Sequence, residues 1–424
     1  MQKSKRRTLF FIRAYNDLDH FTPVIAEFIR KGQNPIVVSY CGLKLSNDYR
    51  IHYLKSIGSI DIREIPDRRF ISVSTAATYF GKILRRIYNY VRQRNNWIAR
   101  LRRHFFFDFS DELKFLHENN VAACVFEWGT PYIRGDLVLR FFLAAKSIGI
   151  KTVAIPHGAN VFVNSDVTIG YRQQFARGNL PDNSDRNLFD YYVLQNPIRR
   201  DGWIRWGYDP IKTQAWGSPR FYPEWAKKNA SLCPAYSPAF DHSGRLKVAF
   251  MQFQKDYNIN KGEIEKALKV LSRNPELCIV VKDSTRAGKE YFNRSKLSGQ
   301  LGESIMEWCG NEVHSPSLID WADCVIVFGS SIGLEVLIQN KFLINPLFFH
   351  SNSTLYEYFG ASHDVGTIDE LNQVLKAVKN GELVNDKKAI GFLLSEVVYA
   401  GGKEFNVPKY YYDKISSPYL DYDN

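Results

Sequence analysis

A turn with two hydroxyl groups near residue 330 follows an apolar run and could bind a phosphate. Cys324–Phe328 is rich in β-branched residues and too short for a helix, which indicates a buried strand. Gly329, Ser330 and Ser331 interrupt this strand, and apolar residues then recur at helical spacing. Backbone N–H groups and the helix dipole favour an anion there, and Glu335 could accept hydrogen bonds from ribose hydroxyls. Alternatively, Ser330 only caps the helix and Glu335 faces solvent.

Two carboxylates and an imidazole follow the first predicted strand, Thr8–Tyr15. Asp17, Asp19 and His20 could supply a general base that deprotonates a hydroxyl group. Capping of the next helix would explain Asp19 without catalysis.

Two further candidates for the catalytic group follow later strands. His157 stands between Pro156 and a glycine, directly after the predicted strand Thr152–Ile155, and Glu127 ends another apolar run. Ligands bind at the carboxyl ends of strands in open α/β sheets, so both side chains could face one opening. A purely structural histidine is the alternative for His157.

Basic residues at two further turns suit a diphosphate. Lys282 ends the predicted strand Leu277–Lys282, Arg286 follows it, and Arg220 ends the turn Gly217–Arg220. A lysine acts as a point charge on phosphate and an arginine as a two-pronged donor. Surface salt bridges would explain these residues equally well.

A basic, aromatic segment stands apart from the rest of the chain. Residues 68–107 contain no acidic residue, and their apolar residues fall close to helical spacing. This composition is typical of a helix at an anionic membrane surface, where each basic residue contributes about 1 kcal/mol. The alternative is a helix that packs on its own domain. The candidate membrane residues are Arg85, Arg86, Arg92, Trp97, Arg100 and Arg103.

Composition narrows the class of protein. The chain has 424 residues, 45% of them hydrophobic and 24% charged, which predicts a soluble protein of two domains. A net charge of +12 indicates an acidic partner, but no nucleic-acid-binding motif accompanies it. Six scattered cysteines indicate reduced thiols. No metal-ligand spacing, dinucleotide-binding glycine motif, serine-hydrolase motif or span of ~18 apolar residues occurs.

Strands alternate with helices in both halves of the chain, which predicts two doubly wound α/β domains facing a cleft. The expected boundaries are 1–225, with a helical insertion at about 76–107, then 245–385, and a tail, 386–424, that could pack on the first domain. A linker is expected from Pro223 to Gly244, and a helix near Leu301–Trp308.

Five motifs together resemble those of bacterial surface-carbohydrate biosynthesis proteins. They are Pro156-His-Gly, Trp216-Gly-Ser-Pro-Arg220, Asp256-Tyr-Asn-Ile259, Val281-Lys-x-x-Thr-Arg286 and Trp321-Ala-Asp-Cys-Val-x-x-x-Gly-Ser-Ser-Ile-x-x-Glu335. The chain is similar to capsule-polysaccharide glycosyltransferases of the GT-B type and, distantly, to CDP-glycerol glycerophosphotransferases. It departs from them at Ser284, where related sequences often carry histidine.

The resemblance implies a metal-independent glycosyltransferase without a cofactor. Its nucleotide-sugar donor would bind the second domain, through Ser330, Ser331, Glu335, Lys282 and Arg286. A polysaccharide or lipid-linked acceptor would enter against the first domain, as in capsule or O-antigen synthesis. We therefore expect a cytoplasmic protein, peripheral on the inner membrane face. A polyol-phosphate transferase and a non-catalytic glycan- or lipid-binding factor are the alternatives, while an epimerase would not need the basic segment.

Overall fold

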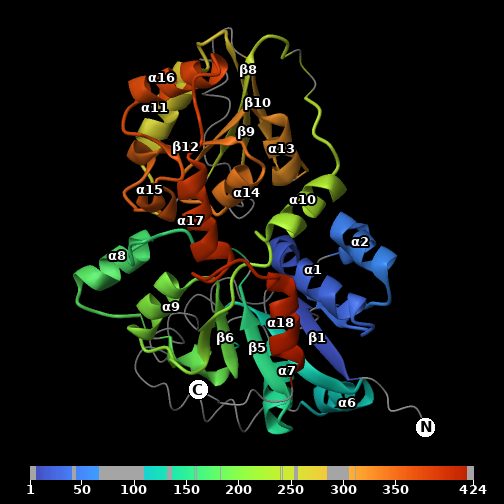
Figure 1. The fold of residues 1–424 in the computed structure, drawn as a ribbon. Helices are drawn as coiled ribbons and strands as arrows, with labels where there is room; N and C mark the ends of the chain where they lie inside the picture. The colour runs from blue at the N-terminus through green and yellow to red at the C-terminus, as the bar shows by residue number, and fades with distance from the viewer. Residues whose placement is uncertain are drawn as a thin grey trace, which may run out of the picture.

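The computed structural model describes residues 6–40, 44–65, 109–129, 131, 136–156, 158, 160–181, 183–238, 240, 242–252, 256–283, 305–310 and 312–417. These residues form two parallel β-sheets, one in each lobe of the molecule, with helices packed against them (Figure 1). The predicted α/β architecture of two doubly wound domains is confirmed. No helix in the described ranges has both the length and the apolar character needed to cross a bilayer.

The first sheet has the strand order β3-β2-β1-β4-β5-β6-β7, and all neighbouring strands are parallel. Its strands are β1 (Arg7–Ile12), β2 (Ile36–Ser39), β3 (Asp61–Glu64), β4 (Val121–Glu127), β5 (Lys151–Ile155), β6 (Tyr191–Leu194) and β7 (Thr213–Ala215). The helices between and after them are α1 (Tyr15–Arg30), α2 (Tyr49–Ile57), α6 (Ser110–Glu118), α7 (Asp136–Ser147), α8 (Ile169–Ala176), α9 (Pro197–Ile204) and α10 (Pro223–Leu232). Alternate residues of β1 pack on opposite faces, Phe10 against α1 and Phe11 against α7.

The second sheet has the order β10-β9-β8-β11-β12-β13 and is also parallel. Its strands are β8 (Leu246–Met251), β9 (Leu277–Lys282), β10 (Ile305–Cys309), β11 (Cys324–Val327), β12 (Phe342–Pro346) and β13 (His363–Val365). Its helices are α11 (Lys261–Leu271), α13 (Ser315–Trp321), α14 (Ile332–Ile338), α15 (Leu355–Phe359) and α16 (Ile368–Lys379). Ile326 of β11 lies in a core with α11 and α16, and Val325 lies in a core with α13 and α14, which explains the unbroken apolar run.

Three local predictions were wrong. Residues 305–309 form β10, not a helix, because they pair with β9; a short apolar run fits either structure. Helix α1 begins at Tyr15 rather than near residue 22, because Asp17 accepts hydrogen bonds from the backbone of Arg13 and Ala14. The expected linker does lie between the two sheets, but it is not irregular throughout, because it contains α10, which begins at Pro223 with proline in its favoured first position.

The C-terminal helices run from the second domain back to the first (Figure 1). Helix α17 (Lys387–Val398) packs on α15, and α18 (Val407–Ser416) packs on α1. The buried Nζ of Lys151 donates to the last carbonyl groups of α18, at 3.3 Å from that of Lys414, and also to that of Ser417. A cation at a helix C-terminus is favourable, so Lys151 fastens α18 to the first sheet.

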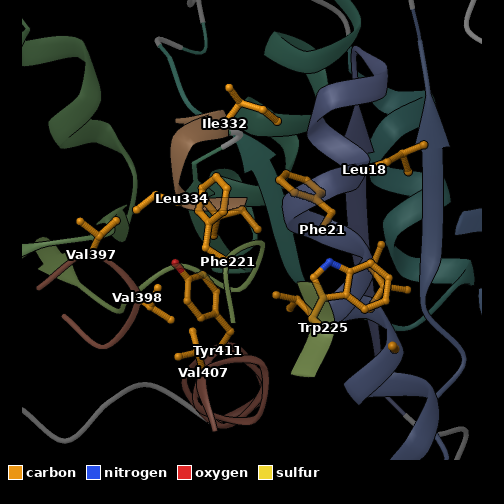
Figure 2. Close-up of a cluster of buried hydrophobic side chains, with 14 of the residues drawn as sticks. Leu18, Phe21, Phe221, Trp225, Ile332, Leu334, Val397, Val398, Val407 and Tyr411 are labelled. Atoms are coloured by element: carbon orange, nitrogen blue, oxygen red, sulfur yellow. The ribbon is translucent and has the colours of Figure 1, made fainter. Parts of the chain in front are cut away.

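One apolar cluster continues through both domains, as Figure 2 shows. Phe21 of α1 and Phe221 meet Leu334 of α14, and Val398 and Tyr411 close the cluster from the C-terminal helices. Each of these side chains is fully buried. Because burial of one such side chain contributes about 1.5–3 kcal/mol, separating the domains at this interface would be costly.

Gly217 lies where the C-terminal helices meet the end of the first domain. Its φ is +80°, and an added Cβ would lie 2.2 Å from the carbonyl oxygen of Val398. Ser218 N–H donates to that same oxygen at 3.0 Å, and Tyr411 Oη donates to the Gly217 carbonyl at 2.9 Å. The turn therefore has room only for glycine.

We expect Gly217→Ala to destabilise the protein by about 2–5 kcal/mol, from left-handed strain plus steric overlap. Gly381→Ala is the control, because Gly381 has φ +70° and nothing within 4 Å of an added Cβ. It should cost only the strain, about 1–2 kcal/mol. Urea denaturation measures both, and equal losses would contradict the steric role of Val398.

Candidate functional site

The carboxyl ends of the two sheets face each other. A Cβ added to Gly158, which follows β5, would lie 3.8 Å from Oγ of Ser331, which follows β11. The Pro-His-Gly and Gly-Ser-Ser motifs of the sequence therefore lie on opposite sides of the interface between the domains. This is the edge at which open α/β sheets bind ligands.

The Gly329–Ser331 turn is held in place from below by Tyr356. Gly329 has φ +65°, a conformation that favours glycine. Tyr356 Oη donates to the carbonyl oxygen of Ser330 at 2.7 Å, and its ring occupies the place of a Cβ at Gly333. Ser330 Oγ accepts from Ile332 N–H at 3.4 Å, whereas the hydroxyl of Ser331 does not cap α14. Helix α14 has only seven residues. The candidate phosphate site is therefore formed by the Gly329–Ser331 turn rather than by the N-terminus of the helix.

Arg220 joins the two domains through an ion-pair network. Its Nη2 lies 2.7 Å from Glu335 Oε1 of α14, and its Nη1 lies 3.0 Å from Asp19 Oδ2 of α1. Asp19 also pairs with Arg50 of α2, which binds Asp48 with an Nη2–Oδ2 distance of 2.6 Å. Asp19 is thus neutralised by two guanidinium groups, which makes it a poor general base.

Glu335 is almost fully buried, with 4% of the residue exposed. Burial raises the pKa of Glu335, although the neighbouring Arg220 lowers it. Its Oε1 is bound by Arg220, and its Oε2 has no hydrogen-bond partner within the described ranges. A buried carboxylate oxygen without a donor is costly, so this atom is suited to accept from a ligand hydroxyl.

Asp17 and Glu127 form a carboxyl pair at the ends of β1 and β4. Asp17 Oδ2 accepts from the N–H groups of Arg13 at 2.8 Å and Ala14 at 2.9 Å, and Arg13 Nη2 lies 3.2 Å from Glu127 Oε1. Burial, and secondarily the charge of Glu127, raises the pKa of Asp17 to about 7. Asp17 can therefore take up or release a proton near neutral pH.

His20 lies in the core and, like Asp17, has no exposed surface. It is fully buried within α1, and its ring meets that of Phe221 edge-on at 5.9 Å between centroids. The sequence predicts a loop after the first strand, with His20 facing the glycan acceptor. Because α1 already includes residue 20, the His20 side chain points into the apolar cluster instead.

Lys282 ends β9 and is buried, with its Nζ donating to the Gly310 carbonyl at 2.7 Å. Burial lowers the pKa of Lys282. Two residues that the sequence analysis missed lie between Lys282 and Arg50. They are His314, at the start of α13, and Tyr49 of α2, whose rings meet edge-on at 5.1 Å. Burial and the charge of Arg50 lower the pKa of His314.

Several predicted site residues lie outside the described residues. They are His157, Arg286, Arg85, Arg86, Arg92, Trp97, Arg100 and Arg103. Among the described residues, no group of three or more histidine, cysteine, aspartate or glutamate side chains could hold a metal ion.

The pKa of Asp17 predicts a pH effect on stability. A carboxyl group whose pKa rises from 3.8 to about 7 on folding stabilises the fold below about pH 4 and loses this contribution as the pH rises toward 7. Asp17→Asn stays neutral and lacks this loss. The melting temperature of the wild type, relative to the variant, should therefore fall between about pH 4 and about pH 8. Asp369→Asn, on the exposed start of α16, controls for loss of a surface carboxylate. If the difference in melting temperature between the wild type and Asp17→Asn does not change with pH, the raised pKa of Asp17 is contradicted.

No protein-family model and no curated protein matches this sequence. Among solved structures, the chain is similar to UDP-GlcNAc 2-epimerase from Neisseria meningitidis bound to UDP-GlcNAc, with a TM-score of 0.55 and 11% identity over 95% of this chain and 97% of that one. It is similar to a glycosyltransferase from Rickettsia africae, with a TM-score of 0.52 and 13% identity over 97% and 99%. It is also similar to HepE from Anabaena in complex with UDP-glucose, with a TM-score of 0.52 and 12% identity over 97% and 98%. These similarities confirm the predicted GT-B-like fold of two Rossmann-like domains.

Proposed function

We propose that this protein is a glycosyltransferase that binds a nucleotide-sugar donor on its second domain and transfers the sugar to a glycan acceptor held against its first. The observation that carries the proposal is Glu335. Its Oε1 is fixed by Arg220 and its buried Oε2 has no partner among the described residues, one helical turn after the Gly-Ser-Ser turn. A ribose hydroxyl would supply the missing donor.

The leaving diphosphate would lie beside the Ser331 hydroxyl, which does not cap α14. Arg220 and Arg50 lie on the first-domain side of the same interface, but each is already paired with two carboxylates, so the donors proposed for the diphosphate are the Ser331 hydroxyl and the backbone N–H groups of the turn. Preorganised donors of this kind act without reorganising during the reaction, so they stabilise the transition state. The proposed transfer is metal-independent, as the resemblance implies.

Asp17 is the proposed general base. Its pKa of about 7 matches the requirement that a base be deprotonated and still attract a proton near neutral pH. Arg13 pairs with Glu127 and donates its backbone N–H to Asp17, so it would hold the two carboxyl groups in place. Asp19 is committed to Arg50 and Arg220 and takes a positioning role instead.

A nucleotide-sugar epimerase is the second candidate, because similar folds include a UDP-GlcNAc 2-epimerase aligned over 95% of this chain.

Thermal shift with UDP-sugars, CMP-sugars and CDP-glycerol identifies the nucleotide. Release of nucleotide only when an acceptor is present indicates the transferase, and interconversion of the sugar without an acceptor indicates the epimerase. Stabilisation by CDP-glycerol alone would indicate a polyol-phosphate transferase. No stabilisation by any nucleotide would leave the non-catalytic binding protein.

Glu335→Gln should weaken binding of the stabilising nucleotide by about tenfold or more, because a hydrogen bond to a charged group contributes about 1.5–3 kcal/mol. Asp19→Asn is the matched control, since it removes the other carboxylate partner of Arg220 and leaves Glu335 in place. Because Asp19 acts only by positioning Arg220, this variant should lose less nucleotide affinity than Glu335→Gln. Isothermal titration measures both constants, and equal weakening would show that Glu335 acts only through Arg220.

The basic segment 76–107, which lies outside the described residues, is proposed to bind anionic membrane reversibly. Its support is the absence of acidic residues from 68 to 107. Because each basic residue contributes about 1 kcal/mol, replacing five arginines by glutamine should release the protein from vesicles that contain anionic lipid. Sedimentation with anionic and neutral vesicles measures this. Unchanged binding would show that the segment packs on its own domain. The five arginines are Arg85, Arg86, Arg92, Arg100 and Arg103.

A further inference from the structure

Arg199 of α9 is a buried arginine without an acidic partner in the described part of the chain. It is 5% exposed, and its Nη1 donates to the carbonyl oxygens of Phe162 and Asn164, both at 3.3 Å. Its Nε has no hydrogen-bond partner there. By contrast, Arg50 and Arg220 each pair with two carboxylates. Of these three buried arginines, only Arg199 has no carboxylate partner among the described residues.

The surroundings of Arg199 keep it charged without neutralising it. Tyr171, Tyr208 and Tyr257 lie near it, and burial lowers its pKa only to about 10. A buried cation without a counter-ion is costly. Its two bonds to carbonyl oxygens anchor the segment 162–164, but neutral donors could make them equally well. Anchoring therefore does not account for a guanidinium group at this position.

A second donor in the same helical turn also lacks a partner. Asn196 caps α9 by accepting from Arg199 N–H at 2.9 Å, and its buried Nδ2 has no hydrogen-bond partner in the described residues. Both residues follow β6, at the carboxyl edge of the first sheet. Gln195, the residue before, donates to the carbonyl oxygen of Gly158, which faces Ser331. Arg199 therefore belongs to the first-domain side of the proposed site.

Arg199 lies next to a contact between the two domains, because it bonds to the carbonyl oxygen of Asn164, whose side chain donates to Asn352. Asn352 of the second domain donates to the carbonyl oxygen of Val167 in the first domain at 3.1 Å. It also accepts from Asn164 at 3.1 Å, next to the carbonyl that Arg199 binds. In the present closed arrangement a ligand at Arg199 would be shielded from water.

We propose that Arg199 binds an oxyanion, a carboxylate or phosphate, carried by the acceptor and enclosed when the domains close. The proposal rests on the proposed function, in which the acceptor occupies the first domain. A guanidinium group binds such oxyanions with two parallel hydrogen bonds. The acceptor is therefore an acidic glycan or a phosphate-bearing, lipid-linked one.

The test uses the full chain and two probes, inorganic phosphate and D-glucuronate, at constant ionic strength set with chloride. A saturable rise in melting temperature with phosphate indicates a phosphate site, and one with D-glucuronate indicates a carboxylate site. Arg199→Met should weaken the effective probe by about tenfold or more, as expected for loss of a charge-assisted hydrogen bond. Arg200→Met is the matched control on the same helix, because Arg200 is 40% exposed and pairs with Asp201. It should leave the shift unchanged.

Arg199→Lys covers the case in which Arg199→Met does not fold. It retains the charge and loses the planar fork, so the shift should persist with weaker affinity. A wild type without a saturable shift, an unchanged shift in both Arg199 variants, or an equal loss in Arg200→Met would overturn the proposal. Loss of nucleotide stabilisation in Arg199→Met would also overturn it, since Arg199 would then serve the donor. If no nucleotide stabilises the wild type but the anion shift depends on Arg199, the proposed function fails and the anion site stands.

Discussion

The arrangement of the two domains depends on one cation shared between two carboxylates. Arg220 lies between Asp19 of the first domain and Glu335 of the second, inside an interface otherwise made of apolar side chains. A buried guanidinium flanked by carboxylates is tolerated only with good geometry, and loss of one partner from such a group typically costs about 3–5 kcal/mol. The apolar cluster supplies the attraction between the domains, while Arg220 sets which carboxylates must face each other. The orientation of α14, and of the turn before it, follows from that constraint.

The second contact between the domains has a different character. Around Asn352, amide groups and backbone carbonyls bind one another, and the Asn352 side chain uses both its oxygen and its nitrogen. The ion pair here, between Arg172 and Asp166, is partly exposed to solvent, and Arg172 also donates to Ser351. Neutral hydrogen bonds contribute about 0.5–1.5 kcal/mol each, less than an ion pair in a buried setting. The domains are therefore joined by an apolar and ionic interface near α1 and by a weaker polar one near α8. Relative movement is therefore expected to be easier at the second interface, which includes Asn164, a partner of Arg199.

The strands and the candidate turns were predictable from the sequence because their causes are local. A run such as Cys324–Val327, short and rich in β-branched residues, favours a strand buried on both faces, and Gly329 marks the turn that follows. Arg220 and Glu335 were both identified, but 115 residues separate them, and nothing local indicates that they pair. Arg50 and His314 were missed for a different reason. Helix α2 was not predicted, and the segment before His314 was assigned to a helix although it forms an edge strand. His20 was misplaced because α1 begins at Tyr15, about two turns earlier than expected, where Asp17 accepts hydrogen bonds from the preceding backbone.

The docking of α18 also bears on how the chain is made. Residues 407–416 complete the surface of a domain whose first strand begins at Arg7, and Lys151 holds them there. A ribosome adds residues from the N-terminus, and domains usually fold as they emerge. Here the first domain cannot reach its final packing until the entire second domain has been synthesised. Contacts of such long sequence separation fold slowly, so a nascent chain would expose the α1 face that α18 later covers. During translation, that face is where a chaperone would be needed.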